Sequence, residues 1–369
     1  ILSETLYQIA LTLIDGVGDV TAKNLLAYCG SANEVFKQKK GLLTKIPGIG
    51  SVTANNLYNN KFVLQRAEEE LKFIEQYKIK PLFFTDENYP KRLKHCSDSP
   101  IMLYFKGNAN LNCEKIIAVV GSRKPSEYGK QVTEEFVKEL KDSGILIVSG
   151  LAYGVDVLSH KMALDIGLNT VGVLGHGLDR IYPHAHERVA KKMLDQGGLL
   201  TDFISKTNPD AVNFPKRNRI VAGMCDALVI IESKHKGGSL ITATIANSYN
   251  KDVFAFPGRA GDVLAEGCNG LIKQNKAGLI ENAADLLHAL QWENNTKKNN
   301  KQTQVPLMLN ITEDEKTIID TFSLKKELHI DEICYACGLT ISKVSVILLQ
   351  LEFNGIIKSK PGKMYLCNV

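Results

Sequence analysis

The chain has 369 residues, of which 45 are Lys or Arg and 40 are Asp or Glu, giving a formal net charge of +5. Apolar residues make up 44% and charged residues 23%, an ordinary globular composition that excludes collagen-like, disordered and coiled-coil proteins. No apolar run approaches the ~18 residues of a membrane span, and the eight cysteines lack the paired spacings of a disulfide framework. Because residues 1–14 lack the basic start of a signal peptide, we expect a cytoplasmic protein with no membrane partner.

Changes in composition along the sequence divide the chain into domains. Residues 81–115 contain Pro81, Pro90 and Pro100 and are typical of irregular structure. Residues 291–304 are rich in Asn, Gln and Lys, which indicates a flexible linker. We predict a helical domain, a central α/β domain, a linker and a small C-terminal domain over residues 1–80, 81–290, 291–310 and 311–369 respectively.

The first region contains an internal repeat. Gly48 and Gly50 follow Gly16 and Gly18 by 32 residues, and each pair separates an apolar helix end from a new helix. The repeat resembles a tandem helix-hairpin-helix module, whose backbone N–H groups can bind a DNA phosphate without reading bases. A turn used only for helix packing explains the pattern equally well, so these four glycines are possible auxiliary DNA contacts.

The central region alternates between apolar strands and helical stretches such as 133–144 and 239–251. Its short Val/Ile/Leu-rich runs are typical of strands buried on both faces. Repeating strand–helix units predict an extended Rossmann-like, doubly wound and mainly parallel sheet, with binding sites at the carboxyl ends of the strands. The predicted strands are 116–120, 145–149, 170–174, 199–201, 227–231 and 252–256.

Glycine-rich turns follow four of these strands. They begin at Gly121, Gly150, Gly175 and, after the fifth strand, Lys236. Any one of them could be a tight chain reversal, but together they predict a crevice that accepts an anion. Neither a dinucleotide fingerprint nor a phosphate-loop motif is present, so we predict no cofactor.

Cationic side chains accompany the turns. Arg123 follows the first strand, and a cluster that opens an apolar helix contains Lys216, Arg217, Asn218 and Arg219. Arg side chains suit bidentate phosphate contacts. The aromatic candidates for base stacking are Tyr153, Tyr182, Phe203 and Phe214, although a core role explains each of them equally well.

The region from 116 to 290 resembles the DNA-processing protein A family. The motifs GSRKPSEYG, SGLAYGVDVLSH, VLGHGLDRIYP, FPKRNRIVAG, KGGSLITATIA, VFAFPG and GCNGLI occur in family order. The resemblance implies a homodimer that binds single-stranded DNA, protects incoming strands and helps load the RecA recombinase in natural transformation. The implied DNA-binding residues are Gly121, Ser122, Arg123, Lys216, Arg217, Asn218, Arg219, Lys236, Gly237, Gly238, Ser239 and Leu240.

An enzyme is the alternative interpretation. The Gly237-Gly238-Ser239 turn distantly resembles nucleoside-monophosphate phosphoribohydrolases, but no carboxylate stands on the first turns of the following helix. Asp156 and Asp179 have a simpler explanation as turn or capping residues. We therefore predict no catalytic residue, and no metal site either, because Cys334-x-x-Cys337 lacks a second pair.

The last region predicts three helices over 313–322, 329–338 and 340–355, followed by a hairpin over 356–367 with its turn at Pro361-Gly362. This order resembles a winged-helix domain. The third helix offers Lys343 and Gln350 among apolar residues, which argues against base readout and favours a protein-contact or auxiliary role.

Overall fold

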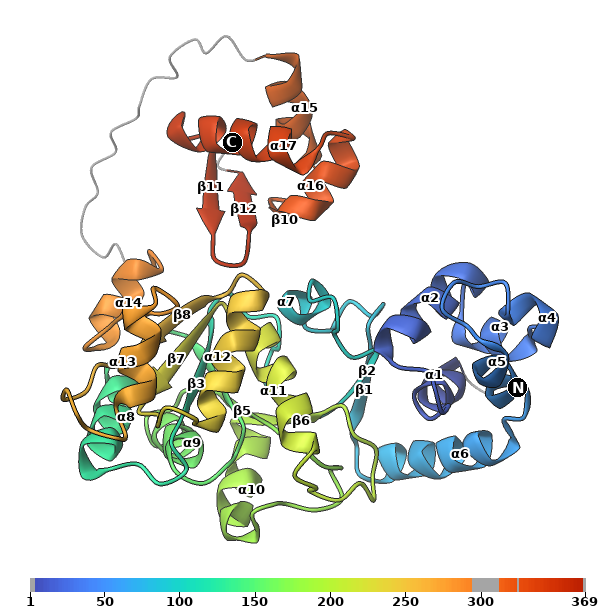
Figure 1. The fold of residues 1–369 in the computed structure, drawn as a ribbon, viewed down its shortest axis with the longest axis horizontal. Coiled ribbons are helices and arrows are strands. Elements are labelled where there is room, and N and C mark those ends of the chain that lie inside the picture. Colours follow the sequence, from blue (N-terminus) through green and yellow to red (C-terminus); the bar gives the residue numbers. More distant parts are fainter. Residues whose placement is uncertain (1–3, 294–311, 324, 368–369) are drawn as a thin grey trace. The chain divides into compact units, whose positions relative to one another are not determined.

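A computed structural model describes residues 4–293, 312–323 and 325–367 (Figure 1). The chain divides into two compact units, residues 1–281 and 282–369. The predicted linker lies outside the described residues from 294 onward. The first unit contains the predicted helical and central domains and is described first.

The core of the first unit is a nine-stranded sheet in the order β1-β2-β6-β5-β4-β3-β7-β8-β9. The strands from β6 to β9 in this order pair in parallel, whereas β1 and β2 pair antiparallel. All six predicted strands are present, so the mainly parallel sheet is confirmed. Their bounds are β3 Ile116–Gly121, β4 Leu146–Ser149, β5 Thr170–Val173, β6 Gly197–Thr201, β7 Ala227–Ile231 and β8 Asp252–Ala255, followed by the short β9 Gly278–Leu279.

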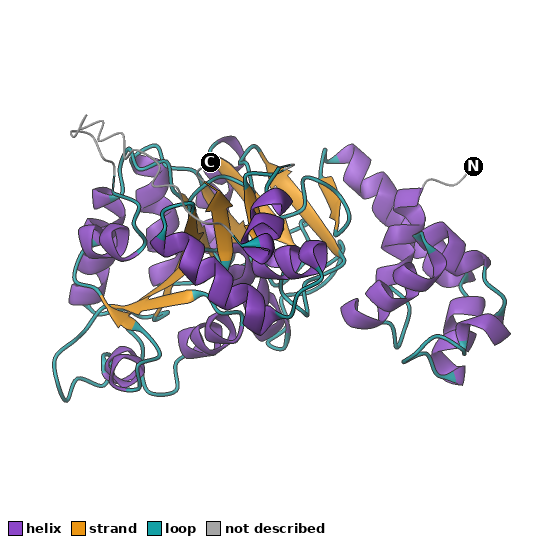
Figure 2. Ribbon diagram, turned by 90° about the horizontal axis from the view of Figure 1, so that it is seen from above, coloured by secondary structure: helices purple, strands orange, loops and turns teal. Residues whose placement is uncertain are grey.

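Helices cover both faces of this sheet (Figure 2). One layer consists of α8 Glu127–Glu139, α9 Val155–Asp165 and α10 Glu187–Asp195, and the other contains α11 Asn213–Met224 and α12 Gly238–Ser248. The inner strands β3, β4, β5, β6 and β7 are buried along almost their whole length. The main core cluster lies between the sheet and α11 and α12, with Ile220, Met224 and Ala243 facing strand residues such as Val148. The remaining elements here are α7 Lys91–Lys94, η1 His184–His186 and α13 Glu266–Lys273.

The prediction of irregular structure over 81–115 is wrong in part. Strands β1 (Lys80–Phe83) and β2 (Met102–Gly107) extend the sheet at its edge, β2 pairing with β6. Pro81 is tolerated because β1 is an edge strand, where a missing N–H breaks no inner ladder bond. Phe83 and Met102 pack into the core of the N-terminal helices. The helical and central domains therefore share a continuous hydrophobic contact.

The N-terminal helices are α1 Glu4–Thr12, α2 Asp19–Cys29, α3 Ala32–Lys37, α4 Lys40–Leu43, α5 Ser51–Tyr58 and α6 Lys61–Gln76. The predicted repeat is visible in the backbone, because α2 and α5 each begin directly after a Gly-x-Gly turn. Gly16 and Gly48 both adopt φ +84°, a conformation that favours glycine. The helix-hairpin-helix interpretation of this region is confirmed.

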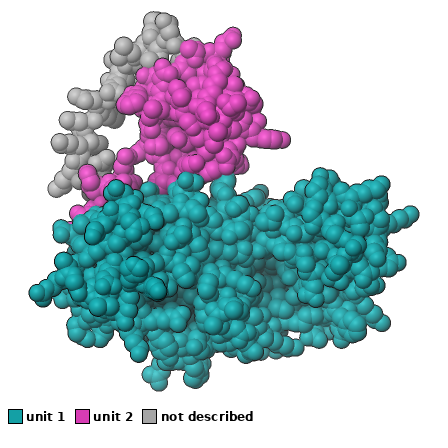
Figure 3. Space-filling view, viewed as in Figure 1, with its two compact units in different colours: residues 1–281 teal, residues 282–369 magenta. Residues whose placement is uncertain are grey.

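The second unit is coloured magenta in Figure 3. It contains α14 Ala283–Ala289, α15 Glu313–Thr321, α16 Ile330–Cys337 and α17 Ile341–Phe353, with strands β10 Glu327–His329, β11 Ile357–Lys360 and β12 Met364–Cys367. The strands form a small sheet in the order β10-β12-β11. The predicted helices and hairpin are present, and β10 is an additional strand that the pattern did not predict. Val344, Leu348 and Leu351 of α17 pack into the core of this winged-helix domain.

Within the described residues, no single helix is long and apolar enough to cross a membrane. Helices α16 and α17 would meet the length and composition criteria only together, and they are bent by 109° relative to each other.

Candidate nucleic-acid interface

The candidate site lies where the winding of the sheet reverses. From β3 the chain moves outward through β4 and β5, and from β7 it moves the opposite way through β8. Ligands of doubly wound sheets bind at the carboxyl ends of the two strands at such a switch point. The register pairs Gly121 with Ile231, so the turn after β3 and the loop after β7 are neighbours. We use the term strand-end site for residues 121–123, 214–219 and 236–240.

The turn after β3 is held rigidly by its neighbours. Ser122 donates its backbone N–H to the carbonyl of Glu232 at 2.9 Å and accepts from the N–H of Val155 at 3.1 Å. A Cβ atom on Gly121 would lie 2.2 Å from the carbonyl oxygen of Ile231. Gly121 is therefore required by packing, and the turn presents the exposed side chain of Arg123 at a fixed place.

Arg123 lies against an aromatic group at the start of α11. Its guanidinium carbon is 5.6 Å from the ring centroid of Phe214, a distance typical of a cation–π contact. The ring of Tyr182 is 5.9 Å from that of Phe214 and is tilted by 36°. Tyr182 is 47% exposed, and Tyr153, on the turn after β4, is 49% exposed. Exposed cationic and aromatic groups therefore meet at this edge.

Lys216 and Arg217 have opposite environments although they are adjacent in sequence. Lys216 is exposed, and within the described parts of the chain no hydrogen bond or ion pair engages its amine. Arg217 is only 4% exposed and donates from Nη1 to the carbonyls of Gly150 (2.5 Å) and Val173. Burial lowers the pKa of Arg217 to about 10, against the opposing effect of Asp156. Arg217 therefore binds the backbone at the ends of β4 and β5. Its buried position does not fit the predicted direct contact with DNA.

Arg219 is also engaged by protein groups. Its guanidinium forms ion pairs with Asp19 and Asp202, both at 2.9 Å, and donates to the carbonyl of Asp98. Although burial disfavours its charge, the two aspartates raise the pKa of Arg219. The predicted DNA contact of Arg219 is thus replaced by a structural role. Asn218 is half-buried and accepts a hydrogen bond from Nε of Arg217 at 3.2 Å.

The predicted glycine turn forms the start of α12, with Gly237 as its N-cap. A Cβ on Gly237 would lie 2.2 Å from Oγ of Ser233, whereas a Cβ on Gly238 would meet nothing within 4 Å. Ser239 is buried and donates its hydroxyl to Oγ of Ser233 at 2.9 Å. Leu240 packs partly against the core. Gly238 and the exposed Lys236 are therefore the members of this turn that an approaching phosphate can reach.

Comparison with known proteins decides the family. The model of the family described as DNA recombination-mediator protein A matches residues 80–291, more than half of the chain. The chain belongs to this family. Further models match the flanking regions: a SAM-like tandem helix-hairpin-helix over residues 9–59 and the DprA winged-helix domain over 308–363.

Alignments with similar proteins cover more than half of this chain. Protein Smf of Synechocystis is 31% identical across 98% of this chain and 98% of its own length. The DNA processing protein DprA of Streptococcus pneumoniae is 38% identical over 56% of this chain and 73% of its own length. The crystal structure of DprA from Streptococcus pneumoniae superposes with a TM-score of 0.68, covering 77% of this chain and 97% of that chain at 32% identity. A structure that describes the single-stranded DNA binding mode of DNA processing protein A from Helicobacter pylori superposes with a TM-score of 0.53 at 31% identity. The match covers 58% of this chain and 96% of that chain.

The two hairpins of this family member differ in their surroundings. Asp19, the residue after the first Gly-x-Gly turn, accepts from the N–H of Ile101 at 2.9 Å and pairs with Arg219. The residue that follows the first hairpin thus contacts the central domain. Cβ atoms on Gly18 of the first hairpin and on Gly48 and Gly50 of the second would meet nothing within 4 Å. All four predicted auxiliary glycines are exposed, so the two hairpins differ in the engagement of Asp19 and not in the accessibility of their glycines.

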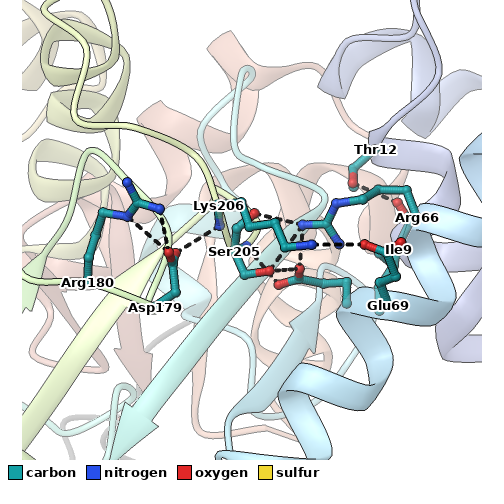
Figure 4. Close-up of polar contacts among 9 residues, drawn as sticks. Ile9, Thr12, Arg66, Glu69, Asp179, Arg180, Ser205 and Lys206 are labelled. Atoms are coloured by element: carbon teal, nitrogen blue, oxygen red, sulfur yellow. Dashed lines mark hydrogen bonds and ion pairs between the residues drawn. The ribbon is translucent and has the colours of Figure 1, made fainter.

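A second contact between the N-terminal helices and the central domain lies at α6 (Figure 4). Arg66 donates to the carbonyl of Ser205 at 2.7 Å and pairs with Glu70 at 2.8 Å. Glu70 is buried and accepts from the N–H of Ser205 at 2.9 Å. Glu69 pairs with Lys206 at 3.1 Å. Two acidic residues of α6 therefore form part of a docking surface.

Sequence reasoning missed the buried role of Arg217, although a signal was present. In the first half of α11, Asn213, Arg217, Ile220 and Val221 are buried at the spacing of one helix face, whereas every position from 220 to 224 is buried. Asp19 stands where the second copy of the repeat has Ser51, and its negative charge makes the first hairpin unsuited to a phosphate.

In the described residues no group of three or more His, Cys, Asp or Glu side chains is placed to hold a metal. Cys334 and Cys337 pack against the winged-helix core.

Proposed function

We propose that this protein binds single-stranded DNA at the strand-end site. The observation that carries the proposal is the group formed by Arg123, Phe214 and Tyr182, because proteins that bind single strands combine cations for the backbone with aromatic rings for the bases. Lys216 and Lys236 add exposed positive charge on the neighbouring turns. The similarity to DNA processing protein A from Helicobacter pylori, whose structure concerns its single-stranded DNA binding mode, supports the same conclusion.

The wider role rests on family membership. We infer that the protein works as a homodimer in the cytoplasm, protects incoming strands during DNA uptake and natural transformation, and helps load the RecA recombinase. The names of the relatives, DNA processing protein and recombination mediator, support a role in DNA recombination. Recombinase loading is testable as faster strand exchange by RecA when this protein is added to a single strand coated with a single-strand-binding protein.

A purely binding role agrees with the chemistry of the Gly237–Ser239 turn. A phosphoribohydrolase needs a carboxylate beside the phosphate to stabilise the sugar cation or activate water, and the first turn of α12 reads Gly-Ser-Leu-Ile. The nearby Glu232 follows β7 rather than standing on this turn, and its carboxylate holds the start of α8 by accepting from the backbone N–H of Ser126 at 2.8 Å and from its hydroxyl. We therefore expect no release of free base when the protein is incubated with nucleoside monophosphates.

The decisive experiment titrates the full chain with a labelled oligo-dT strand and a matching duplex at several salt concentrations. We expect a clear preference for the single strand and affinity that falls steeply with salt, because bound phosphates release counterions. Arg123→Ala should weaken binding roughly tenfold and reduce the salt slope by about 0.7, the value for one lost phosphate contact on a single strand.

Arg123→Lys is the matched control, since it keeps the charge but loses the planar stacking on Phe214. We expect it to restore the salt slope and part of the affinity. Equal binding of strand and duplex, or unchanged affinity of a folded Arg123→Ala variant, would contradict the proposed site.

A further inference from the structure

A pocket of about 450 Å³ opens beside the strand-end site, at the carboxyl ends of β7 and β8. Its buried lining residues are the apolar Ile231, Phe256 and Ala265 and the carboxylate of Glu232, and its exposed lining residues include Tyr128 and Arg259. The volume lies in the range of small-molecule sites, which are mostly apolar with a few polar groups. The strand-end site as defined above uses none of these residues.

The pocket is a built feature rather than a loose gap between loops. Asn269 of α13 holds the loop after β8 with two hydrogen bonds, accepting from the N–H of Gly258 at 3.1 Å and donating to its carbonyl at 2.9 Å. A Cβ on Gly258 would lie 2.4 Å from Cβ of Ala265, so the loop needs glycine there. The hydroxyl of Tyr128 donates to the carbonyl of Pro257 at 3.1 Å. These contacts account for the VFAFPG and GCNGLI segments, which the strand-end site leaves unexplained.

The charges of the lining residues indicate which chemical groups a ligand of this pocket would carry. Glu232 is a buried carboxylate, and Ser126 uses only part of the hydrogen-bonding capacity of its two oxygens. Arg259 is exposed, and among the residues that the structure describes no hydrogen bond or ion pair holds its guanidinium. Asp262 also lines the pocket and accepts from the N–H of Leu264 at 2.9 Å. Two carboxylates and one arginine disfavour a bare anion in the interior but suit a group with N–H donors.

A nucleobase carries such donors on a flat, largely apolar body. We propose that this pocket binds a nucleobase, with its N–H groups toward Glu232, its face against Tyr128 and its attached phosphate on Arg259. The base can come from a free mononucleotide or from a bound strand. The second source rests on the proposed function and is within reach, because the carbonyl of Glu232 accepts from the N–H of Ser122 in the strand-end site.

The first arm of the test titrates the full chain by calorimetry with the four deoxynucleoside monophosphates and with inorganic phosphate. We expect nucleotides to bind and inorganic phosphate not to bind. Arg259→Ala should weaken nucleotide binding five- to tenfold, and Tyr128→Ala should weaken it to a similar degree. Arg188→Ala, which removes an exposed arginine of α10, is the matched control and should bind normally.

The second arm uses an oligonucleotide that carries 5-iododeoxyuridine, which cross-links under light to an aromatic ring stacked on it. An adduct on Tyr128, mapped by mass spectrometry, shows that a strand supplies the base. Nucleotide binding that depends on Arg259, without that adduct, shows that the free nucleotide is the ligand.

The proposal is overturned if neither nucleotide binding nor the adduct on Tyr128 is observed, or if nucleotide binding persists unchanged in both Arg259→Ala and Tyr128→Ala. Binding of inorganic phosphate as tight as that of nucleotides also overturns it. A protein that binds no oligonucleotide at all refutes the proposed function, while the mononucleotide arm still decides the pocket.

Discussion

Arg123, Arg217 and Arg219 carry the same charge but occupy three different environments. Arg123 is exposed and lies over the ring of Phe214. Arg217 is buried against backbone carbonyls, and Arg219 is held between two aspartates. An arginine whose donors are already engaged cannot also bind a phosphate without losing those partners. Of the three, Arg123 is therefore the one available to a ligand.

Arg217→Met is expected to destabilise the fold. Burial already raises the pKa of Asp156, and Arg217 is the charge that opposes this effect. A buried polar group that loses its partner typically costs about 1–3 kcal/mol of unfolding free energy, and the carbonyls of Gly150 and Val173 both lose their donor in this variant. Urea denaturation measures the loss. Lys216→Met, the exposed neighbour, should change stability by less than about 0.5 kcal/mol. Equal effects of the two variants would refute the buried role of Arg217.

His160 should make stability depend on pH in the acidic range. It is fully buried, and its Nδ1 lies 2.6 Å from Oγ1 of Thr170, whose hydroxyl donates to the carbonyl of Ile147. Nδ1–H is thus the donor, while Nε2 has no partner among the described residues. Burial lowers the pKa of His160 from 6.5 to about 3, so the unfolded chain binds the extra proton first.

Because the unfolded chain binds the proton at higher pH than the folded chain does, acid lowers the stability of the fold. Stability contributed by neutral His160 is complete above pH 6.5 and falls as pH decreases toward 3, by at most about 1.4 kcal/mol per pH unit. Denaturation curves at pH 7, 6, 5 and 4 measure the slope. His160→Gln, which cannot be protonated, should have a shallower slope whatever its absolute stability. An unchanged slope would mean that other groups, among them His176, whose pKa burial also lowers, dominate the dependence.

At the scale of elements, the predictable strands are those covered by helices on both sides. The apolar runs of β3, β4 and β7 are continuous because neither face of these strands meets water. Strands β1 and β2 were not predicted, since Pro81 and the neighbouring prolines indicate loops, and their place in the sheet comes from pairing with the distant β6. The position of the site was predictable once the strands were, because binding sites of such sheets lie at the carboxyl ends of the strands. The sequence did not show that Lys216 is exposed and Arg217 buried, because this depends on which side of α11 packs against the sheet.

The two hairpins test how surroundings change equivalent residues. Asp19 and Ser51 occupy the same place in the repeat, as the first residues of α2 and α5. Asp19→Ala removes an ion pair with Arg219 and the acceptor for Ile101, so we expect a loss of about 2–4 kcal/mol. Ser51→Ala should cost less than about 0.5 kcal/mol. Thermal unfolding of both variants measures the difference, and similar losses would show that the docking contact contributes nothing.

At the scale of the whole molecule, the first unit is held together at two places. Arg219 connects the first hairpin to the central domain, and the cluster around Glu70 connects α6 to residues 205–206 (Figure 4). Between these two places, Ile101, Met102 and Tyr104 of the sheet edge lie in the core of the N-terminal helices. Two polar attachments on either side of a shared apolar core resist rotation as well as separation. We therefore expect the second hairpin to keep a fixed position relative to the strand-end site.

Glu70→Gln tests this attachment, with Glu69→Gln as its matched control. Glu70 is 2% exposed and binds Arg66 and Ser205, so loss of its charge removes the carboxylate that pairs with the Arg66 guanidinium, whose Nη1 is buried without a partner among the described residues. We expect its unfolding free energy to fall by about 3–5 kcal/mol, with faster amide exchange in α6 and at residues 204–206. Glu69 is half exposed where it meets Lys206, and such surface pairs contribute at most about 1 kcal/mol. If Glu70→Gln lowers stability without accelerating exchange at residues 204–206, the cluster stabilises α6 alone and the N-terminal helices are free to move relative to the central domain.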